Sequence, residues 1–369
     1  MKYLFINSVA GYGSTGRIAA ETCRELMKEG HRCVLAFARM RDGCDDIETL
    51  RIGKPLDVKV HALTSRFLDN SGFGSKAATK AFIRDVKEYD PDVIWLHNLH
   101  GYYIHLPTLF SYLRTCGKEI LWTLHDCWSF TGHCAYFDYA RCDRWKTGCH
   151  HCPEKSSYPA SILVDSSRSN YLRKRELFTG IPNMKLLVPS NWLKDRVRQS
   201  FLGEYPVEVV YNRVNRELFR PLEGDMRQRH GLEDKIILLG VASVWDRRKG
   251  LEDFVALSKL LDDRYCCVLI GLNEKQIQSL PNNMRGLGRT DTVEDLIRWY
   301  TTADVFVNPS TEETFGMTTL EAQCCGTKAV VYENTACQEI AEAFGGIAVP
   351  WGAEHLAVAV KQLTMEENK

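Results

Sequence analysis

The feature that most constrains the fold is an alternation of short apolar runs with helical patterns, repeated along nearly the whole chain. Compact apolar runs such as Lys2–Asn7, Val93–Leu96 and Val305–Val307 predict buried strands. Strands that alternate with helices favour parallel sheets covered on both faces. The 369 residues are enough for two such α/β domains, each with its own core.

The alternation divides into two series. Residues 221–231 are polar and punctuated by proline and glycine, as linkers are, and a new series begins at residues 236–242. We place the boundary between residues 180 and 225 and expect a first domain at 1–187 and a second at 188–369.

The balance of charge argues against nucleic acid as a partner, because 47 basic residues face 47 acidic ones. Residues 1–187 carry 26 Lys and Arg against 20 Asp and Glu, and residues 188–369 carry 21 against 27. This asymmetry is either scatter over solvated faces or a first domain that faces an anionic membrane surface. The first residues lack a signal-peptide pattern, and no run of eighteen apolar residues occurs, so we expect a cytoplasmic protein with reduced or metal-bound cysteines.

A glycine-rich loop, SVAGYGSTGR, follows the first predicted strand and opens a helical pattern. Gly13 and Gly16 allow backbone amides to approach a ligand closely, as in phosphate-binding loops. The spacing departs from G-x-G-x-x-G, so a tight turn without a ligand fits the pattern as well.

Histidines follow two further predicted strands of the first domain: His97 and His100 after one, His125 after the next. Ligands of open α/β sheets bind outside the carboxyl ends of the strands, which favours substrate contact for His125 above all. The alternative is that each histidine only hydrogen-bonds loop backbone.

Residues 127–153 interrupt the α/β pattern with a cysteine-rich insertion. Cys149 and Cys152 form a C-x-x-C knuckle, and Cys134 and Cys142 complete a set that would suit a tetrahedral structural zinc ion. Such a metal would stabilise a loop-rich segment. Free thiols, or disulfides in an oxidising compartment, are the alternatives.

In the second domain the stretch Ser310–Thr327 combines acidic residues, a glycine and a helix start. Glu313 and Glu321 lie eight residues apart, too far for two groups acting on one glycosidic bond but suitable for the two ends of a nucleotide sugar. Gly316 and the backbone amides near Met317 and Thr318 could approach the phosphates. For Glu321, a favourable charge in the first turn of the helix is the alternative explanation.

The segment SVWDRRKG follows the first strand of this domain and ends at a helix start. Lys249, flanked by Arg247 and Arg248, would lie at the same sheet edge as Glu313 and neutralise a diphosphate there. The alternative is a solvated basic turn.

The order and spacing of these blocks resemble retaining glycosyltransferases of the GT-B fold, family 4 (glycogen-synthase-like). The matching segments are the glycine loop, TLHD at 123–126, VPSNWLKD at 188–195, VVYNRVNRELFRP at 209–221, RKG at 248–250, ADVFVNPS at 303–310 and E-x7-E at 313–321. TLHDCWSFTGHC and CHHCP resemble a bacterial subgroup that builds exopolysaccharide, capsule or lipopolysaccharide.

The resemblance implies two Rossmann-like domains facing each other across a cleft and catalysis without a metal cofactor. Glu313 would contact the donor sugar, Glu321 the ribose and Lys249 the diphosphate. His125 would lie near the transferred sugar, and the loop at Gly13–Gly16 would close over the donor. The donor would be a UDP- or GDP-sugar and the acceptor a glycan or a lipid-linked sugar.

Several positions depart from the pattern of the family. Ser243 replaces an arginine that usually lies six residues before the lysine, so Arg247 or Arg248 would take its role. Ser243 favours one alternative, a sugar-nucleotide or zinc-knuckle binding module with weak or no catalysis. A second alternative is an epimerase of nucleotide sugars on the same fold.

Overall fold

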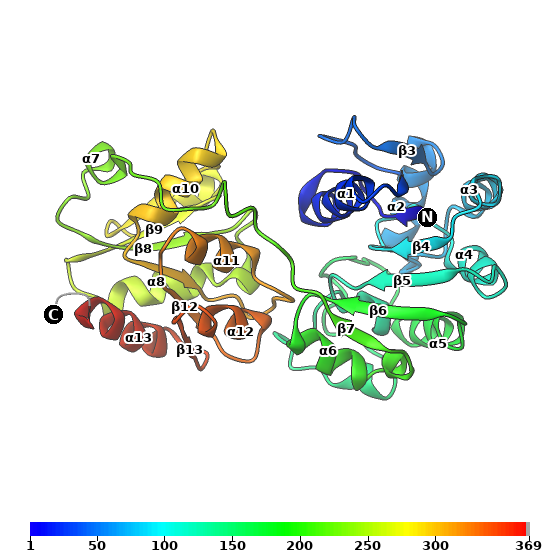
Figure 1. The fold of residues 1–369 in the computed structure, drawn as a ribbon. Coiled ribbons are helices and arrows are strands. Elements are labelled where there is room, and N and C mark those ends of the chain that lie inside the picture. The colour runs from blue at the N-terminus through cyan, green and yellow to red at the C-terminus, as the bar shows by residue number, and fades with distance from the viewer. Residues whose placement is uncertain (367–369) are drawn as a thin grey trace. The chain divides into compact units, whose positions relative to one another are not determined.

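In a computed structural model, which describes residues 1–366, the chain forms two compact units, Met1–Val210 and Tyr211 onward (Figure 1). Each unit contains one parallel β-sheet with helices on both faces. The predicted α/β class with two Rossmann-like domains, the architecture of the GT-B fold, is therefore confirmed.

The elements of the first unit follow in chain order: β1 (Lys2–Ile6), α1 (Gly13–Lys28), β2 (Arg32–Phe37), β3 (Glu48–Arg51), α2 (Pro55–Leu68), α3 (Lys76–Tyr89), β4 (Val93–Leu96), α4 (Leu106–Leu113), β5 (Glu119–Thr123), α5 (Ser167–Phe178), β6 (Met184–Val188), α6 (Asn191–Arg198) and β7 (Val207–Val209). Short 3-10 turns lie at Trp128–Phe130 (η1), Arg144–Lys146 (η2) and Phe201–Glu204 (η3).

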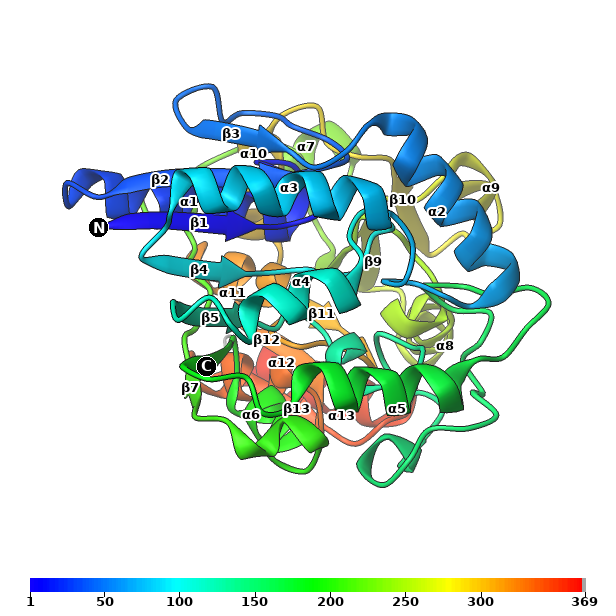
Figure 2. The ribbon, with the colours of Figure 1, turned by 90° about the vertical axis from the view of Figure 1, so that its right-hand side faces the viewer.

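The first sheet has the strand order β3-β2-β1-β4-β5-β6-β7, and all neighbouring strands are parallel. Helices α3, α4 and α5 cover one face and α1 covers the other (Figures 1 and 2). Strand β1 serves both cores, because Leu4 and Ile6 pack in one cluster and Phe5 in the other. Successive side chains of a strand point to opposite faces, so a strand buried on both sides is apolar throughout.

The elements of the second unit are α7 (Met226–His230), β8 (Ile236–Val241), a 3-10 turn η4 (Arg247–Lys249), α8 (Leu251–Leu260), β9 (Tyr265–Ile270), α9 (Glu274–Gln278), β10 (Met284–Leu287), α10 (Val293–Thr302), β11 (Val305–Asn308), α11 (Met317–Cys324), β12 (Ala329–Tyr332), α12 (Ala336–Glu342), β13 (Ile347–Val349) and α13 (Ala353–Glu366).

The second sheet has the order β10-β9-β8-β11-β12-β13, again with parallel neighbours. Leu238 of β8 packs in the core under α8 and α13, whereas Ile237 and Leu239 pack in the core under α10, α11 and α12. The chain order reverses between β8 and β11, and such a switch point is where open α/β sheets bind ligands.

The domain boundary predicted at residues 187 and 188 lies too early. Strand β7 pairs with β6 through Leu186 and Val207, and helix α6 contacts both strands and the turn η3. Residues 188–210 therefore complete the first sheet. The sequence predicts a strand at residues 207–211, but its apolar pattern does not show which sheet the strand joins. The observed division after Val210 lies within the predicted range of residues 180–225. No helix among the described residues is long and apolar enough to cross a membrane.

Candidate functional site

The loops after β8 and β11 lie against each other at the switch point of the second sheet. The two strands pair at Leu238 and Val305. In the loops, the N–H of Thr311 donates to the carbonyl of Arg248 at 2.9 Å. Gly250 has φ +71°, and a Cβ there would come within 2.6 Å of Pro309. This position therefore requires glycine both for its backbone angle and for its close approach.

Lys249 and Glu313, one from each loop, form an ion pair between Nζ and Oε1. Their side chains are 25% and 16% exposed, so both remain accessible to a ligand. Asp246 orders the lysine turn, since its carboxylate accepts the N–H of Arg248 at 3.0 Å and that of Lys249 at 3.2 Å. The predicted meeting of Lys249 and Glu313 at one sheet edge is present in the structure.

The two arginines flanking the lysine lie in η4 as well. Arg248 reaches Asp246 at 3.1 Å and Glu312 at 3.9 Å, where the carboxylate of Glu312 is only 3% exposed. Its guanidinium is thus held close to the Lys249–Glu313 pair by two carboxylates. Arg247 starts the turn.

Helix α11 begins one residue after Gly316, which has φ +89°. A Cβ on Gly316 would come within 2.5 Å of the sulfur of Cys337, so no other residue fits without displacement. Met317 and Thr318 are the first two helical residues, and amides at this position have no acceptor within the helix. The amides of Met317 and Thr318, which are suited to binding an anion, therefore lie directly after the loop that contains Glu313.

Glu321 lies in the second turn of α11, and its Oε2 accepts the hydroxyl of Tyr300 at 2.9 Å. Tyr300 is completely buried in α10, and burial together with the Glu321 charge raises its pKa well above the ordinary value. The tyrosine hydroxyl therefore stays protonated and orients the carboxylate. Sequence reasoning missed Tyr300, because a buried tyrosine on a helix is usually a core residue.

In the first unit the histidines after β4 and β5 form a buried cluster. His97 Nδ1 lies 2.9 Å from His125 Nε2, and the rings stack at 5.2 Å between centroids. Burial lowers the pKa of His125 to about 4 and that of His97 well below its ordinary value. Both imidazoles are therefore neutral at pH 7, so they serve as hydrogen-bonding groups rather than as cations.

His100 belongs to a second pair. Its Nε2 lies 2.8 Å from Oδ2 of Asp126, and its Nδ1 lies 3.1 Å from the hydroxyl of Tyr158. Burial raises the pKa of Asp126, but the charge and hydrogen bond of His100 and the Trp128 amide outweigh burial, so the net pKa is lowered. Asp126 is the last residue of the TLHD segment, but the sequence gives it no separate role, and Tyr158 lies in a segment without a regular pattern.

The glycine loop follows β1 as predicted. Gly13 begins α1 with φ +65°, and Gly16 is buried within the helix, where an added Cβ would come within 3.0 Å of Val9. Gly16 thus has a packing role, and the loop around Gly13 stays open, since nothing lies within 4 Å of a Cβ built there.

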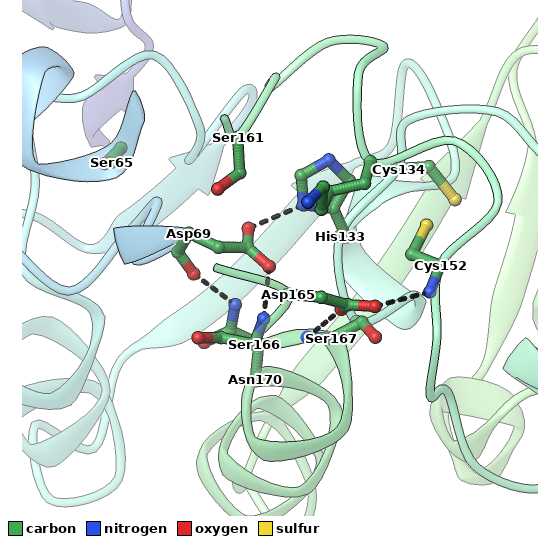
Figure 3. Close-up of polar contacts among 12 residues, drawn as sticks. Ser65, Asp69, His133, Cys134, Cys152, Ser161, Asp165, Ser166, Ser167 and Asn170 are labelled. Atoms are coloured by element: carbon green, nitrogen blue, oxygen red, sulfur yellow. Dashed lines mark hydrogen bonds and ion pairs between the residues drawn. The ribbon is translucent and has the colours of Figure 1, made fainter. Parts of the chain in front are cut away.

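The cysteine-rich insertion contains only the turns η1 and η2, but it packs Phe130, Phe137 and Trp145 into the first core. The insertion is fastened to α5 by carboxylates: Asp69 accepts from His133 and from the Ser166 amide, and Asp165 accepts from the Cys152 amide at 2.8 Å (Figure 3).

Cys134, Cys142, Cys149 and Cys152 line one pocket of the insertion. The thiols of Cys134 and Cys152 are hydrogen-bonded, and Figure 3 shows their sulfurs facing each other. Cys149 accepts the N–H of Gly132 at 3.2 Å. Within residues 1–366, however, no three cysteine, histidine or acidic side chains are placed closely enough to hold a metal ion. The predicted zinc therefore stays a prediction.

Comparison with known proteins gives matches to two family models. Residues 15–218 match Glycosyltransferase Family 4, and residues 234–366 match Glycosyl transferases group 1. Over 135 residues the chain is 40% identical to the colanic acid biosynthesis glycosyl transferase WcaC of Escherichia coli K12, covering 34% of this chain and 32% of WcaC.

Over 138 residues it is 27% identical to an N,N'-diacetylbacillosaminyl-diphospho-undecaprenol α-1,3-N-acetylgalactosaminyltransferase of Campylobacter jejuni, covering 36% of each chain. The alignments thus span about a third of these relatives. HepE of Anabaena, solved with UDP and glucose, superimposes with a TM-score of 0.67 at 15% identity over 100% of this chain and 91% of HepE.

We predict a dependence of stability on pH from the buried histidines. A histidine whose folded pKa is depressed leaves stability intact above its unfolded pKa, and this stability is lost as the pH falls, because the unfolded chain binds the proton first. For His125, between its ordinary value of 6.5 and about 4, the loss is on the order of 2 kcal/mol at pH 5. The free energy of unfolding, measured with urea between pH 7 and pH 5, should fall less steeply with decreasing pH in His125→Gln than in the unaltered chain. His355→Gln, at an exposed position, is the control, and equal slopes in both variants would contradict the prediction.

Proposed function

Since this chain belongs to glycosyltransferase family 4, we propose that it transfers a sugar from a UDP- or GDP-sugar to a glycan or lipid-linked acceptor in the synthesis of a bacterial surface polysaccharide, such as a capsule or lipopolysaccharide. The observation that carries this proposal is the ion pair of Lys249 and Glu313 at the switch point of the second sheet. The functions named for the relatives from Escherichia coli and Campylobacter, and the UDP and glucose bound to HepE, support the donor and acceptor classes.

In the proposed reaction the diphosphate of the donor replaces Glu313 as the partner of the Lys249 ammonium group. An ammonium that exchanges one anion for another stays paired throughout, so the diphosphate is bound at small electrostatic cost. The released carboxylate of Glu313 then accepts hydroxyl groups of the donor sugar. The amides of Met317 and Thr318 and the guanidiniums of Arg247 and Arg248 add positive potential for the leaving group.

Glu321, held by Tyr300, would accept the ribose hydroxyls, and a fixed carboxylate loses less entropy on binding than a free one. His125, neutral at pH 7, would hydrogen-bond the transferred sugar. The bond between the anomeric carbon and the diphosphate oxygen breaks as the acceptor oxygen bonds to the same face of that carbon. The acceptor proton goes to the leaving phosphate. Because the new bond forms on the same face, the anomeric configuration is retained, and Lys249 with the flanking arginines, rather than a metal ion, neutralises the diphosphate.

Glu313→Gln tests this assignment, because it keeps the shape of the side chain and removes the charge. We expect nucleotide release from the productive UDP- or GDP-sugar to fall by about 100-fold or more. Glu342→Gln, an exposed acid at the end of α12, should retain full turnover. Unchanged turnover in Glu313→Gln, or inversion of the anomeric carbon in the product by NMR, would contradict the mechanism.

We further propose that Cys134, Cys142, Cys149 and Cys152 bind a structural zinc ion. The shared pocket, the N–H bonds from Gly132 to Cys149 and from Glu154 to Cys152, and the turn at His150–His151 that Arg144 holds support it. Backbone N–H groups stabilise thiolates. The thiols would have to close onto the ion by rotation about χ1, which suits side chains on irregular backbone.

Elemental analysis of protein purified without chelators should find about one zinc ion per chain. Cys149→Ser combined with Cys152→Ser should lose it, whereas Cys116→Ser, a half-buried cysteine at the end of α4, should keep it. A metal-free chain with either four free thiols or a Cys134–Cys152 disulfide would refute the zinc proposal.

Contact with a membrane surface is proposed for the first unit. Helix α2 exposes Leu56, Val60, Leu63 and Phe67 at helical spacing, between 40% and 67% each. Leu163, 68% exposed, lies beside them, because the neighbouring amides of Ile162 and Val164 donate to the carbonyls of Arg66 and Phe67. An exposed apolar face flanked by basic residues is typical of helices that lie on anionic bilayers, and Lys54, Lys59 and Arg66 are exposed here.

Sedimentation with phosphatidylglycerol vesicles should show binding by the unaltered chain and little to phosphatidylcholine alone. Leu63→Glu should weaken it about tenfold, since the lost burial of one leucine is of that size. The control is Val358→Glu, which alters an equally exposed apolar residue of α13 in the second unit. Equal binding of both variants would exclude α2 as the contact.

A further inference from the structure

Two tyrosines and an arginine from three different loops gather at the carboxyl edge of the first sheet. Arg39 follows β2, Tyr102 follows β4, and Tyr158 lies between the cysteine-rich insertion and α5. The rings of Tyr102 and Tyr158 meet edge to face with 6.3 Å between centroids. Tyr158 is 46% exposed and Arg39 is exposed, so the group faces solvent although its supports are buried.

The hydroxyl of Tyr158 is held in place by the buried pair of His100 and Asp126. Asp126 Oδ2 lies 2.8 Å from Nε2 of His100, and the hydroxyl of Tyr158 lies 3.1 Å from Nδ1 of the same ring. Whichever of these two groups donates, the oxygen of Tyr158 keeps at least one lone pair for a hydroxyl group of a ligand. A surface tyrosine with only a solubilising role would need no such support.

Tyr102 is held in an unfavourable backbone conformation, with φ +66°. Gly101, with φ +110°, precedes it and lies so close to Ser8 that a Cβ would come within 3.0 Å. Positive φ is rare for a bulky side chain and is concentrated at ligand sites. The turn keeps the positive φ of Tyr102, and in this conformation its ring lies beside that of Tyr158.

Positive charge surrounds this aromatic pair. The guanidinium of Arg39 acts electrostatically on both tyrosines, and that of Arg66 acts on Tyr102. The guanidinium of Arg39 forms no ion pair within the part of the chain that the structure describes. Tyr102 also contacts His61 of α2, at 6.0 Å between ring centroids, so the group adjoins the helix with the exposed apolar face.

We propose that Tyr102, Tyr158 and Arg39 form an acceptor subsite that binds a pyranose ring and the phosphate attached to it. This inference rests on the proposed function and names the acceptor class as a sugar linked through phosphate to a lipid. The apolar faces of a pyranose pack on tyrosine rings, its hydroxyls bond to the Tyr158 oxygen, and the arginine binds the phosphate. The lipid would extend toward the α2 face.

Saturation-transfer NMR on the full chain tests the subsite with three probes: methyl glucoside, methyl glucuronide and glucose 1-phosphate. We expect transfer to the ring protons of glucose 1-phosphate, reduced about fivefold in Tyr102→Ala and in Tyr158→Ala. Arg39→Gln should lose the preference for glucose 1-phosphate over methyl glucoside. Tyr139→Ala, which removes an exposed tyrosine of the cysteine-rich insertion, is the control and should keep both the transfer and the preference.

Transfer to UDP, measured in the same samples, reports on the second unit and so separates the two proposals. Unchanged UDP signals with lost sugar signals in the tyrosine variants support the subsite. Sugar signals that UDP displaces, equal signals in all variants, or no transfer from any of the three probes would overturn it. A preference for methyl glucuronide over glucose 1-phosphate would overturn the phosphate assignment. Absence of binding of both UDP and GDP, each measured in this way, would contradict the donor assignment and leave the sugar result to decide the subsite.

Discussion

The parallel pairing of strands is the constraint on which the rest of the structure depends. In a parallel sheet the carboxyl ends of all strands lie at one edge. The pairing of the strands therefore brings together residues that are distant in sequence and that follow these ends. Lys249 and Glu313 meet because β8 pairs with β11. His97 and His125 meet because β4 pairs with β5, through Leu96 and Trp122.

At these edges the polar side chains are kept in place by groups that do not themselves face a ligand. Asp246 orders the turn of Lys249, Tyr300 orients Glu321, and Asp126 fixes His100. Each support removes rotational freedom before binding, which lowers the entropy lost when a ligand is bound. The supports are buried or half-buried, so their hydrogen bonds are little weakened by competition with water.

The insertion after β5 connects two properties of the first unit that the sequence presents separately. Its cysteines lie in one pocket, and Tyr158, five residues after its end, reaches His100 beside the histidine cluster. The amide of Ala135, next to Cys134, donates to the carbonyl of Tyr158 at 3.4 Å. Whatever stabilises the cysteine segment therefore also positions Tyr158, and the segment's lack of helix or strand makes such stabilisation valuable.

The sequence by itself determined the fold class, the two-sheet division and the meeting of Lys249 with Glu313, because hydrophobic periodicity and turn residues are local signals and the parallel topology follows from their order. It placed the domain boundary too early, because the apolar pattern of β7 does not show which sheet the strand joins, and pairing with β6 decides this. Only the tertiary structure decided that Tyr300, Asp126 and Tyr158 support or adjoin the predicted residues, and that burial keeps His125 neutral. Contacts between irregular segments and the desolvation of a side chain depend on packing across the whole domain, and no local pattern carries that information.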